Sequence, residues 1–141
     1  MTTGAYLLIA EVKQKELILK IGALGKLTFK KGFFCYVGSA MGKSSTSLEK
    51  RIFRHIKTSF RPSGTEIVLP KIHWHIDYFL SDRAVKLVKI AMIPSQIKEE
   101  CSIAQQIFSS QPCNIVRGFG SSDCRCDGHL AYFKSLKGFL N

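Results

Sequence analysis

The sequence has no apolar run that approaches the roughly 20 residues a transmembrane helix requires. Its first four residues, Met1-Thr2-Thr3-Gly4, also lack the positive charge with which a signal peptide begins. Internal repeats, low-complexity tracts and linker-like segments are missing as well. We therefore expect a cytoplasmic protein with no membrane partner, built as a single domain over residues 1–141.

Acidic residues are scarce, with 10 Asp and Glu against 21 Lys and Arg, which leaves a net charge of +11. The excess is uneven, because residues 1–61 hold twelve Lys and Arg against three Glu, whereas residues 62–141 hold nine against seven acids. A basic excess confined to part of one small domain is typical of a protein that binds a polyanion, although a solubilising surface would give the same count. The charge therefore favours a nucleic-acid partner without distinguishing an enzyme from a binding module.

The five cysteines do not indicate a disulfide framework, since their number is odd and a cytoplasmic chain keeps its thiols reduced. Cys35 lies in the apolar run 33–37 and is expected in the core. Cys124, Cys126 and His129 form the only cluster that resembles a metal site, although the spacing of the two cysteines is shorter than that of most structural zinc sites. Zinc at this cluster is an alternative to be tested. A fourth ligand would come from His73, His75 or Cys101.

The β-rich segments predict a small antiparallel sheet. Residues 4–12 and 16–21 read as a hairpin that turns at the polar residues 13–15, and residues 33–37 read as a third strand. Further short strands are expected at 85–93 and 114–119, and helices at 46–60, 73–80, 95–110 and 130–140. We expect an α/β protein of the α+β type, with a small central three-stranded antiparallel sheet flanked by helices, an extra β-hairpin near 17–29 and short additional strands.

Residues 46–60 carry the most regular helical pattern. Thr46 and Glu49 have the spacing of a capping box. Apolar side chains that recur at helical spacing predict one buried stripe, made of Leu48, Ile52, Phe53, Ile56 and Phe60. Arg51 and His55 are four residues apart and therefore lie on one face of this helix.

The glycine-rich segment 38–44 is similar to a phosphate-binding loop of an NTPase but does not match it. Three residues separate Gly38 from Gly42, whereas that loop needs four so that its amides can surround the phosphates. A turn that leads into the helix is the better interpretation, and a nucleoside triphosphate is not an expected partner.

Two tripeptides carry more information. Gly4-Ala5-Tyr6 begins the first expected strand and Tyr36-Val37-Gly38 ends the third, so the two could be neighbours in the sheet. With the segments that follow, the sequence resembles the GIY-YIG nuclease superfamily, and within it a subgroup of small, mainly prokaryotic and archaeal proteins without an established activity. Those segments, which occur in order along nearly the whole chain, are 39–40, 51–55, 73–78, 100–101 and 118–124. The two tripeptides are separated by residues 7–35, a longer stretch than in the simpler nucleases, and the extra hairpin would occupy it.

The resemblance implies a metal-dependent endonuclease that hydrolyses phosphodiester bonds in DNA, with Mg²⁺ as the expected metal. The residues it implies for catalysis are Tyr6, Tyr36, Arg51, His55 and Glu100, with Glu100 as the Mg²⁺ ligand. The chemistry suits these residue types: an arginine can clamp phosphoryl oxygens bidentately, one carboxylate can hold a hydrated Mg²⁺, and a tyrosine can deprotonate water if nearby cations lower its pKa. The alternative is a non-catalytic nucleic-acid-binding module. In either case we expect basic side chains to contact the phosphate backbone of the nucleic acid, namely Lys43, Lys50, Arg54, Lys57 and Arg61.

Each of these residues also has a structural interpretation. The tyrosines can be packing residues of strands, and Arg51 can belong to a solvated basic helix face. Glu100, next to another glutamate, can be a surface residue. For His73 and His75 we expect a structural hydrogen bond to Asp77 rather than a pair of metal ligands.

Overall fold

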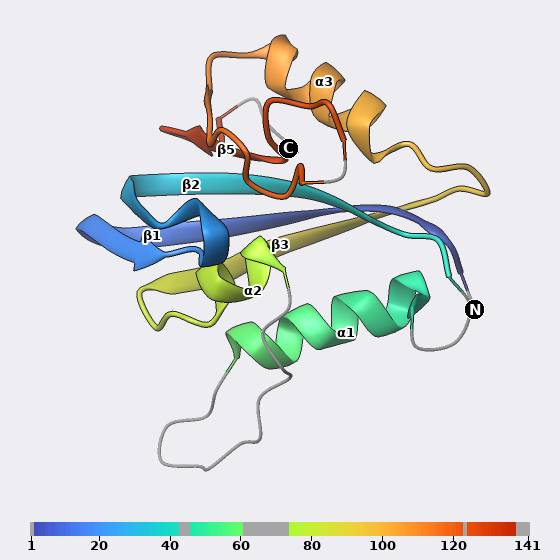
Figure 1. Ribbon diagram of the computed structural model, residues 1–141, viewed down its shortest axis with the longest axis horizontal. Coiled ribbons are helices and arrows are strands. Elements are labelled where there is room, and N and C mark those ends of the chain that lie inside the picture. Colours follow the sequence, from blue (N-terminus) through green and yellow to red (C-terminus); the bar gives the residue numbers. More distant parts are fainter. Residues whose placement is uncertain (1, 43–45, 61–73, 123, 138–141) are drawn as a thin grey trace.

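The computed structural model describes residues 2–42, 46–60, 74–122 and 124–137. Its centre is a five-stranded antiparallel sheet in the order β3-β1-β2-β5-β4 (Figure 1). The strands are β1 (Gly4–Lys20), β2 (Lys26–Ala40), β3 (Val85–Pro94), β4 (Asn114–Ile115) and β5 (Leu130–Phe133). The helices are η1 (Gly22–Leu24), α1 (Leu48–Ser59), α2 (His75–Leu80) and α3 (Glu100–Ser110).

The prediction of a three-stranded central sheet was wrong, although the chain is of the α+β type. Residues 4–12 and 16–21 are not two strands of a hairpin, because residues 4–12 and 16–20 both belong to β1 and pair with the single strand β2. The polar residues 13–15 lie at a bulge, where the register shifts between Val12 and Glu16 and the side chains are exposed. The polar residues on this exposed stretch of a long strand therefore have the sequence pattern of a turn although they lie within the strand. The chain reverses instead at η1, between Gly22 and Gly25, which both have positive φ angles.

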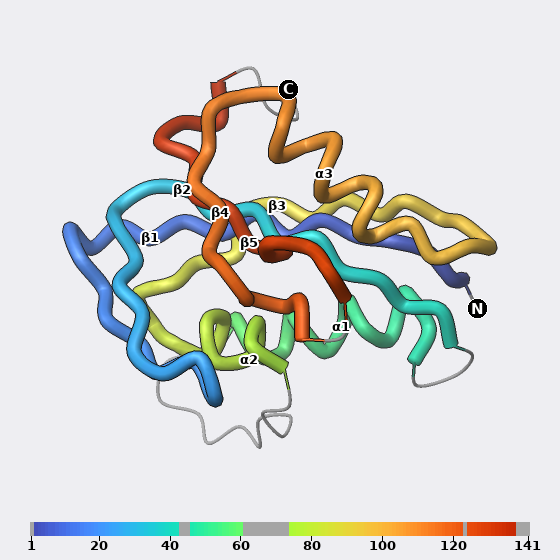
Figure 2. Tube along the Cα trace, turned by 45° about the horizontal axis from the view of Figure 1, so that its top comes forward, coloured from blue at the N-terminus to red at the C-terminus, as the bar shows by residue number. Residues whose placement is uncertain are grey.

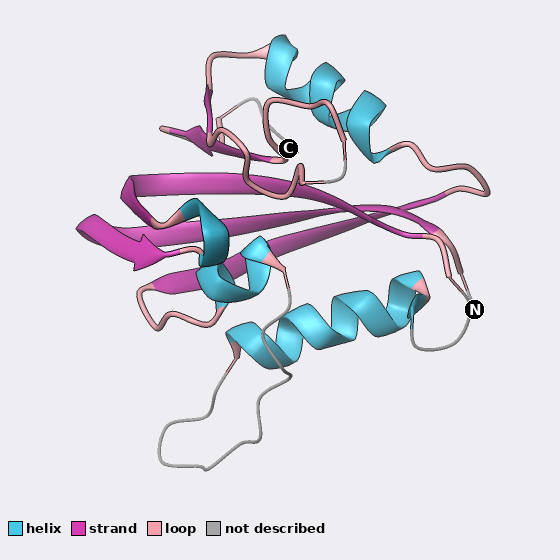
Figure 3. Ribbon diagram, in the orientation of Figure 1, coloured by secondary structure: helices cyan, strands magenta, loops and turns pink. Residues whose placement is uncertain are grey.

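The two faces of β1 serve two different cores. Tyr6 and Leu8 face the layer that contains α1 and α2, whereas Leu7 and Ile9 face α3. Figure 3 shows α1 and α2 on one side of the sheet and α3 on the other. This alternation follows from the two-residue period of a strand, and it explains why β1 begins with seven consecutive buried residues. Cys35 lies on the α3 side and is buried, which confirms its prediction as a core residue.

The start of α1 differs from the predicted capping box. Ser47, not Thr46, is the N-cap residue, and its side chain accepts a hydrogen bond from the Lys50 amide at 3.4 Å. Glu49 accepts hydrogen bonds from the Thr2 amide and hydroxyl instead of reaching back to the cap. Of the predicted apolar stripe, Leu48 and Ile52 are buried and Ile56 is partly buried, whereas Phe53 and Phe60 are exposed.

The C-terminal segment is a strand where a helix was predicted. Residues 130–133 form β5, which pairs with residues 33–36 of β2. Figure 2 shows the segment after α3 crossing to this edge of the sheet, where β4 and β5 lie. Leu130 and Phe133 have a spacing that suits a helix, but long-range pairing with β2 decided the outcome. As a result, the residues just before β5 lie beside β2.

No helix in the described ranges is long and apolar enough to cross a membrane.

Candidate functional site

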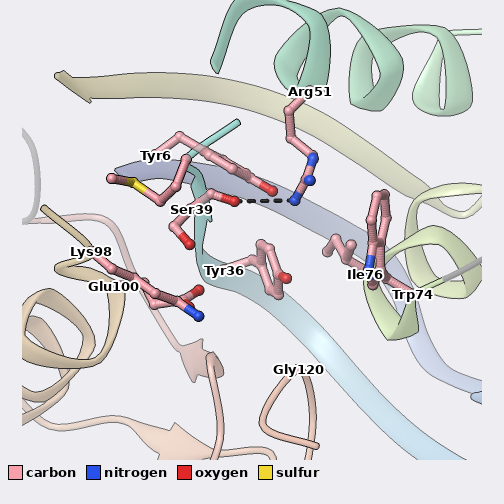
Figure 4. A pocket seen from close by; sticks show the side chains of 10 residues that line it. Tyr6, Tyr36, Ser39, Arg51, Trp74, Ile76, Lys98, Glu100 and Gly120 are labelled. Carbon is pink, nitrogen blue, oxygen red and sulfur yellow. Dashed lines mark hydrogen bonds and ion pairs between the residues drawn. The ribbon is translucent and has the colours of Figure 1, made fainter. Parts of the chain in front are cut away.

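A cavity of about 330 Å³ opens between the start of β1, the end of β2, helix α1 and the start of α3 (Figure 4). Four of the five residues predicted for catalysis line it, and the fifth, His55, lies directly behind Tyr6. These residues come from elements that are far apart in the sequence. The lining residues are Tyr6, Tyr36, Ser39, Met41, Arg51, Trp74, Ile76, Lys98, Glu100 and Gly120.

Strand register explains why the two tripeptides meet. Tyr6 is the register partner of Gly38, so its ring lies across the backbone of β2 at that position. A Cβ atom on Gly38 would overlap the ring and hydroxyl of Tyr6, so the close approach requires glycine. The rings of Tyr6 and Tyr36 are tilted, with their centroids 6.3 Å apart. Both phenols therefore belong to one wall of the cavity.

Tyr6 and His55 form a buried hydrogen-bonded pair. The Tyr6 hydroxyl lies 2.8 Å from His55 Nε2, and both residues are at most 1% exposed. Burial lowers the pKa of His55 to about 4, and Asp77 opposes that shift only in part. Among the described residues, no group forms a hydrogen bond with His55 Nδ1. The imidazole is therefore neutral at neutral pH.

The condition under which Tyr6 could act as a base by itself, a pKa lowered by nearby cations, is not met. Burial raises the pKa of Tyr6 above its usual range, and the nearby Arg51 guanidinium compensates for only part of that shift. Burial likewise raises the pKa of Tyr36, and Tyr6 and Glu100 add to the effect. Both tyrosines are neutral phenols in the resting site, and each can donate one hydrogen bond.

Arg51 projects from α1 into the cavity. Its Nη1 donates to the Ser39 carbonyl oxygen at 3.1 Å, and its guanidinium carbon lies 4.3 Å from the centroid of the Trp74 ring. Figure 4 shows the guanidinium directed toward the Tyr6 hydroxyl. The stacked ring and the carbonyl fix the plane of the guanidinium, as bidentate binding of an anion requires.

Trp74 was not predicted as a site residue. It precedes α2 in the chain and reaches Arg51 only because α2 packs against α1. Two signals were available in the sequence: Trp74 is the only tryptophan, and it lies in segment 73–78, one of the segments that carry the resemblance. Ser39, Lys98 and Gly120 were missed for the same reason, because only the tertiary structure brings them to the cavity.

Arg54, expected among the nucleic-acid contacts, lies in an ion pair. Its Nη2 is 2.8 Å from Oδ2 of Asp77, whose side chain is 1% exposed, and Asp77 Oδ2 also accepts from the Trp74 amide at 2.9 Å. The expected hydrogen bond from His75 to Asp77 is not formed, since His75 Nδ1 accepts from the Gly120 amide at 2.9 Å.

The other basic side chains predicted to contact nucleic acid divide into two groups. Lys50 and Lys57 are exposed on α1. Lys43 and Arg61 lie outside the described residues. His73, which was considered as a metal ligand and as a partner of Asp77, lies outside them as well.

We predict that Arg54→Met lowers the free energy of unfolding by about 2–3 kcal/mol, because it removes the ion pair from a buried carboxylate. Lys57→Met, an exposed change one turn further along α1, should alter it by less than about 0.5 kcal/mol. Urea denaturation of both variants measures the difference. Equal stabilities would show that Asp77 does not depend on Arg54.

Glu100 lies on the wall opposite Arg51, and among the described lining residues it is the only carboxylate. It is the first residue of α3, its side chain is 16% exposed, and its Oε1 lies 3.2 Å from Lys98 Nζ. A partly buried carboxylate at the edge of a polar, open cavity suits a cation that retains most of its water ligands, as Mg²⁺ does. Lys98 is largely exposed and can move away from the carboxylate without leaving a buried charge.

Next to this cavity lies a cluster of four side chains that could hold a metal ion. Cys101, Cys124, Cys126 and His129 each offer one ligand atom, and these atoms lie within 4.8 Å of one another. Cys101, one of three candidates for the fourth ligand, therefore completes the predicted trio. His75 instead bonds to Gly120.

Comparison with known proteins found one family. Residues 5–141 match the family described as "Domain of unknown function DUF123". No curated protein and no solved structure matches the chain.

Proposed function

The chain belongs to the DUF123 family, a domain of unknown function, and from its cavity we propose that it is a metal-dependent endonuclease that hydrolyses phosphodiester bonds in DNA. The observation that carries this proposal is the placement of a fixed guanidinium, two neutral phenols and a single carboxylate around one cavity. A phosphodiester needs positive charge and hydrogen-bond donors around its non-bridging oxygens while water attacks the phosphorus.

Arg51 would supply the positive charge. Its guanidinium is held by the Ser39 carbonyl and the Trp74 ring, so it does not have to reorganise when negative charge develops on the phosphoryl oxygens. Tyr36, a neutral phenol on the same wall, would donate a hydrogen bond to one of these oxygens. Lysine at position 51 would provide the charge without the bidentate geometry.

Tyr6 and His55 would receive the proton of the attacking water. Because the pKa of Tyr6 is raised, a phenolate cannot exist there before the reaction. The neutral imidazole offers an acceptor 2.8 Å away, so the Tyr6 proton can pass to His55 Nε2 while the Tyr6 oxygen takes a proton from water. The resulting hydroxide forms the new P–O bond as the bond to the leaving oxygen breaks. The Tyr6 hydroxyl then gives its proton to the leaving oxygen or to solvent, and the imidazolium returns its Nε2 proton to the Tyr6 oxygen.

Glu100 would hold the divalent metal, which we infer to be Mg²⁺. When bound, such an ion neutralises charge on the phosphoryl group and stabilises the leaving oxygen. Glu100, which lies on the side of the cavity opposite Arg51, would hold the ion there. The resemblance of the ordered motifs to the GIY-YIG nucleases supports the same assignment, as does the basic excess of residues 1–61.

The direct test is cleavage of duplex, branched and damaged DNA with and without Mg²⁺. Glu100→Gln should raise the Mg²⁺ concentration needed for half-maximal cleavage roughly tenfold or more, because the ion loses its charged ligand. Glu99→Gln is the matched control, since Glu99 does not line the cavity and its replacement should leave that concentration unchanged. No cleavage of any substrate, or equal Mg²⁺ requirements for the two variants, would refute the proposal.

The second candidate is a nucleic-acid-binding module without catalysis, which the exposed Lys50 and Lys57 on α1 favour. It predicts salt-dependent DNA binding that persists in Glu100→Gln. Binding of this kind with no cleavage would select it.

A further inference from the structure

The four ligand atoms of the Cys/His cluster come from two separate parts of the chain. Cys101 lies in the first turn of α3, Cys124 and Cys126 lie between β4 and β5, and His129 directly precedes β5. Their Sγ and Nε2 atoms all lie within 4.8 Å of one another. Tertiary structure, and not local sequence, therefore brings the three thiols and the imidazole together.

The distances within the cluster suit a tetrahedral metal. His129 Nε2 lies 3.7 Å from Cys101 Sγ and 3.3 Å from Cys124 Sγ. Zinc binds thiolates at about 2.3 Å and imidazole at about 2.0–2.1 Å, which in a tetrahedron places sulfur and nitrogen about 3.6 Å apart. The side chains therefore already have nearly the separations that a bound ion would impose.

The orientation of His129 points to the same ligand. Its Nδ1 lies 3.1 Å from the Val37 carbonyl oxygen, and the residue is 1% exposed. Because a carbonyl can only accept, Nδ1 must carry the proton, and in the neutral imidazole the lone pair is then on Nε2, which faces the thiols. Histidines that bind a metal through one ring nitrogen usually donate the N–H of the other ring nitrogen to a carboxylate, a backbone carbonyl or water, as His129 does to Val37.

The loop that carries the cysteines is held in place by its own backbone. The His129 amide donates to the Phe119 carbonyl oxygen at 2.7 Å, and the Gly118 amide donates to the Asp127 carbonyl oxygen at 2.7 Å. The Val37 amide in turn donates to the His129 carbonyl oxygen at 2.9 Å. Only Cys101 reaches the cluster from another element, so an ion would join α3 to this loop.

We propose that Cys101, Cys124, Cys126 and His129 bind a structural Zn²⁺ ion. Three thiolates and one imidazole are soft ligands that select zinc over Mg²⁺, and four protein ligands leave no position open for catalysis. The ion also fixes the first turn of α3 against the loop that contains Gly120. Glu100 precedes Cys101 in the chain, and both Glu100 and Gly120 line the cavity. Zinc therefore keeps these two parts of the cavity lining at a fixed distance from each other. The consequence for Glu100 rests on the proposed function, whereas zinc binding does not.

Zinc content of the purified protein tests the site. Wild-type protein prepared without chelators should contain about one zinc per chain, and Cys101→Ser and Cys126→Ser should contain less than a tenth of that. Cys113→Ser is the matched control, because Cys113 is a partly buried thiol that donates to the Phe108 carbonyl oxygen outside the cluster. Folded wild-type protein without zinc after growth in zinc-supplemented medium, or full zinc content in Cys126→Ser, would overturn the proposal.

Cobalt substitution keeps the test decisive if the variants do not fold. The wild-type chain reconstituted with Co²⁺ should show thiolate-to-cobalt charge-transfer bands together with the absorption of a tetrahedral ion. A thiol titration of the unfolded, metal-free chain should find all five cysteines reduced. Absence of the cobalt bands would overturn the proposal, and a disulfide among the cluster cysteines would assign the cluster to redox chemistry instead.

Amide exchange tests the link to α3 without using activity. The Ile103 amide donates to the Glu99 carbonyl oxygen at 2.9 Å across the first turn of α3. Removal of zinc with a chelator should speed its exchange at least tenfold, and addition of Zn²⁺ should restore protection. Amides in the centre of β1 should not change. If the exchange rate of the Ile103 amide after zinc removal stays within twofold of its rate in the zinc-loaded protein, zinc does not hold this turn.

Discussion

Replacement of Arg51 by alanine is expected to lower kcat/KM for DNA cleavage about 10³-fold. Arg51 is the one arginine among the described lining residues, and its guanidinium is held rigid by the Ser39 carbonyl and the Trp74 ring. Loss of a preorganised donor from a catalytic site typically costs 10²–10³-fold in rate, and here a charge is lost with it. The effect should appear in kcat, because the interaction strengthens as charge develops on the phosphoryl oxygens.

Two control variants separate this effect from folding and from general electrostatics. Arg51→Lys retains the charge but not the planar fork, so it should recover only part of the activity. Lys86→Ala removes an exposed charge from β3, outside the lining residues, and should change cleavage less than about threefold at moderate salt. Thermal unfolding should show a loss of about 1 kcal/mol for Arg51→Ala, as expected for one hydrogen bond and one cation–π contact. Cleavage by Arg51→Ala within threefold of wild type would contradict the assignment of the site.

Acidification is expected to destabilise the protein through His55. The folded state holds the pKa of His55 at about 4, whereas a histidine in the unfolded chain titrates near 6.5. Between these values the unfolded state binds the extra proton, so the free energy of unfolding falls as pH decreases from about 6.5 to 4. The full difference amounts to about 3 kcal/mol. This contribution is present above pH 6.5 and is lost at acidic pH.

Comparison with His55→Gln isolates this contribution. Glutamine can accept the hydrogen bond from Tyr6 but cannot be protonated. Burial also lowers the pKa of His75, so some acid sensitivity remains in both proteins, and only the difference between them belongs to His55. Urea denaturation at pH 7, 6, 5 and 4.5 should show stability curves that diverge as the pH falls. Parallel curves would mean that His55 is protonated within the folded state.

The elements predicted correctly are those whose pattern is long and local. Strand β3 and helices α1 and α3 were each predicted near their observed positions, because apolar spacing repeats over two or more turns or pleats. Two of the errors lie at residues 13–15 and 130–133, where a polar triplet has the pattern of a turn and an apolar spacing has the pattern of a helix. In both places, pairing with β2 overrode the local pattern. The strand predicted at 114–119 is observed only at Asn114–Ile115.

The candidate site could be assembled from the sequence only as a set of residue types. Tyr6, Tyr36, Arg51 and Glu100 were all named from motifs, and the structure brings them to one cavity. Trp74 and Lys98 could not be named, since nothing in their local sequence indicates which segment they approach. Arg54 was assigned to a nucleic-acid surface, but it lies against Asp77, a partner 23 residues away.

The sequence by itself determined the α+β class, the basic excess on residues 1–61 and the order in which the tyrosines, arginine and glutamate occur. The charge is a sum over residues, and the element patterns and motif order depend only on neighbouring residues, so these properties follow from the sequence alone. The tertiary structure decided which groups are charged and which cysteines are neighbours. Burial keeps Tyr6 and His55 neutral, and the fold brings Cys101 to a loop more than 20 residues further along the chain. Desolvation and proximity depend on all segments packed around a group, and therefore no local pattern encodes them.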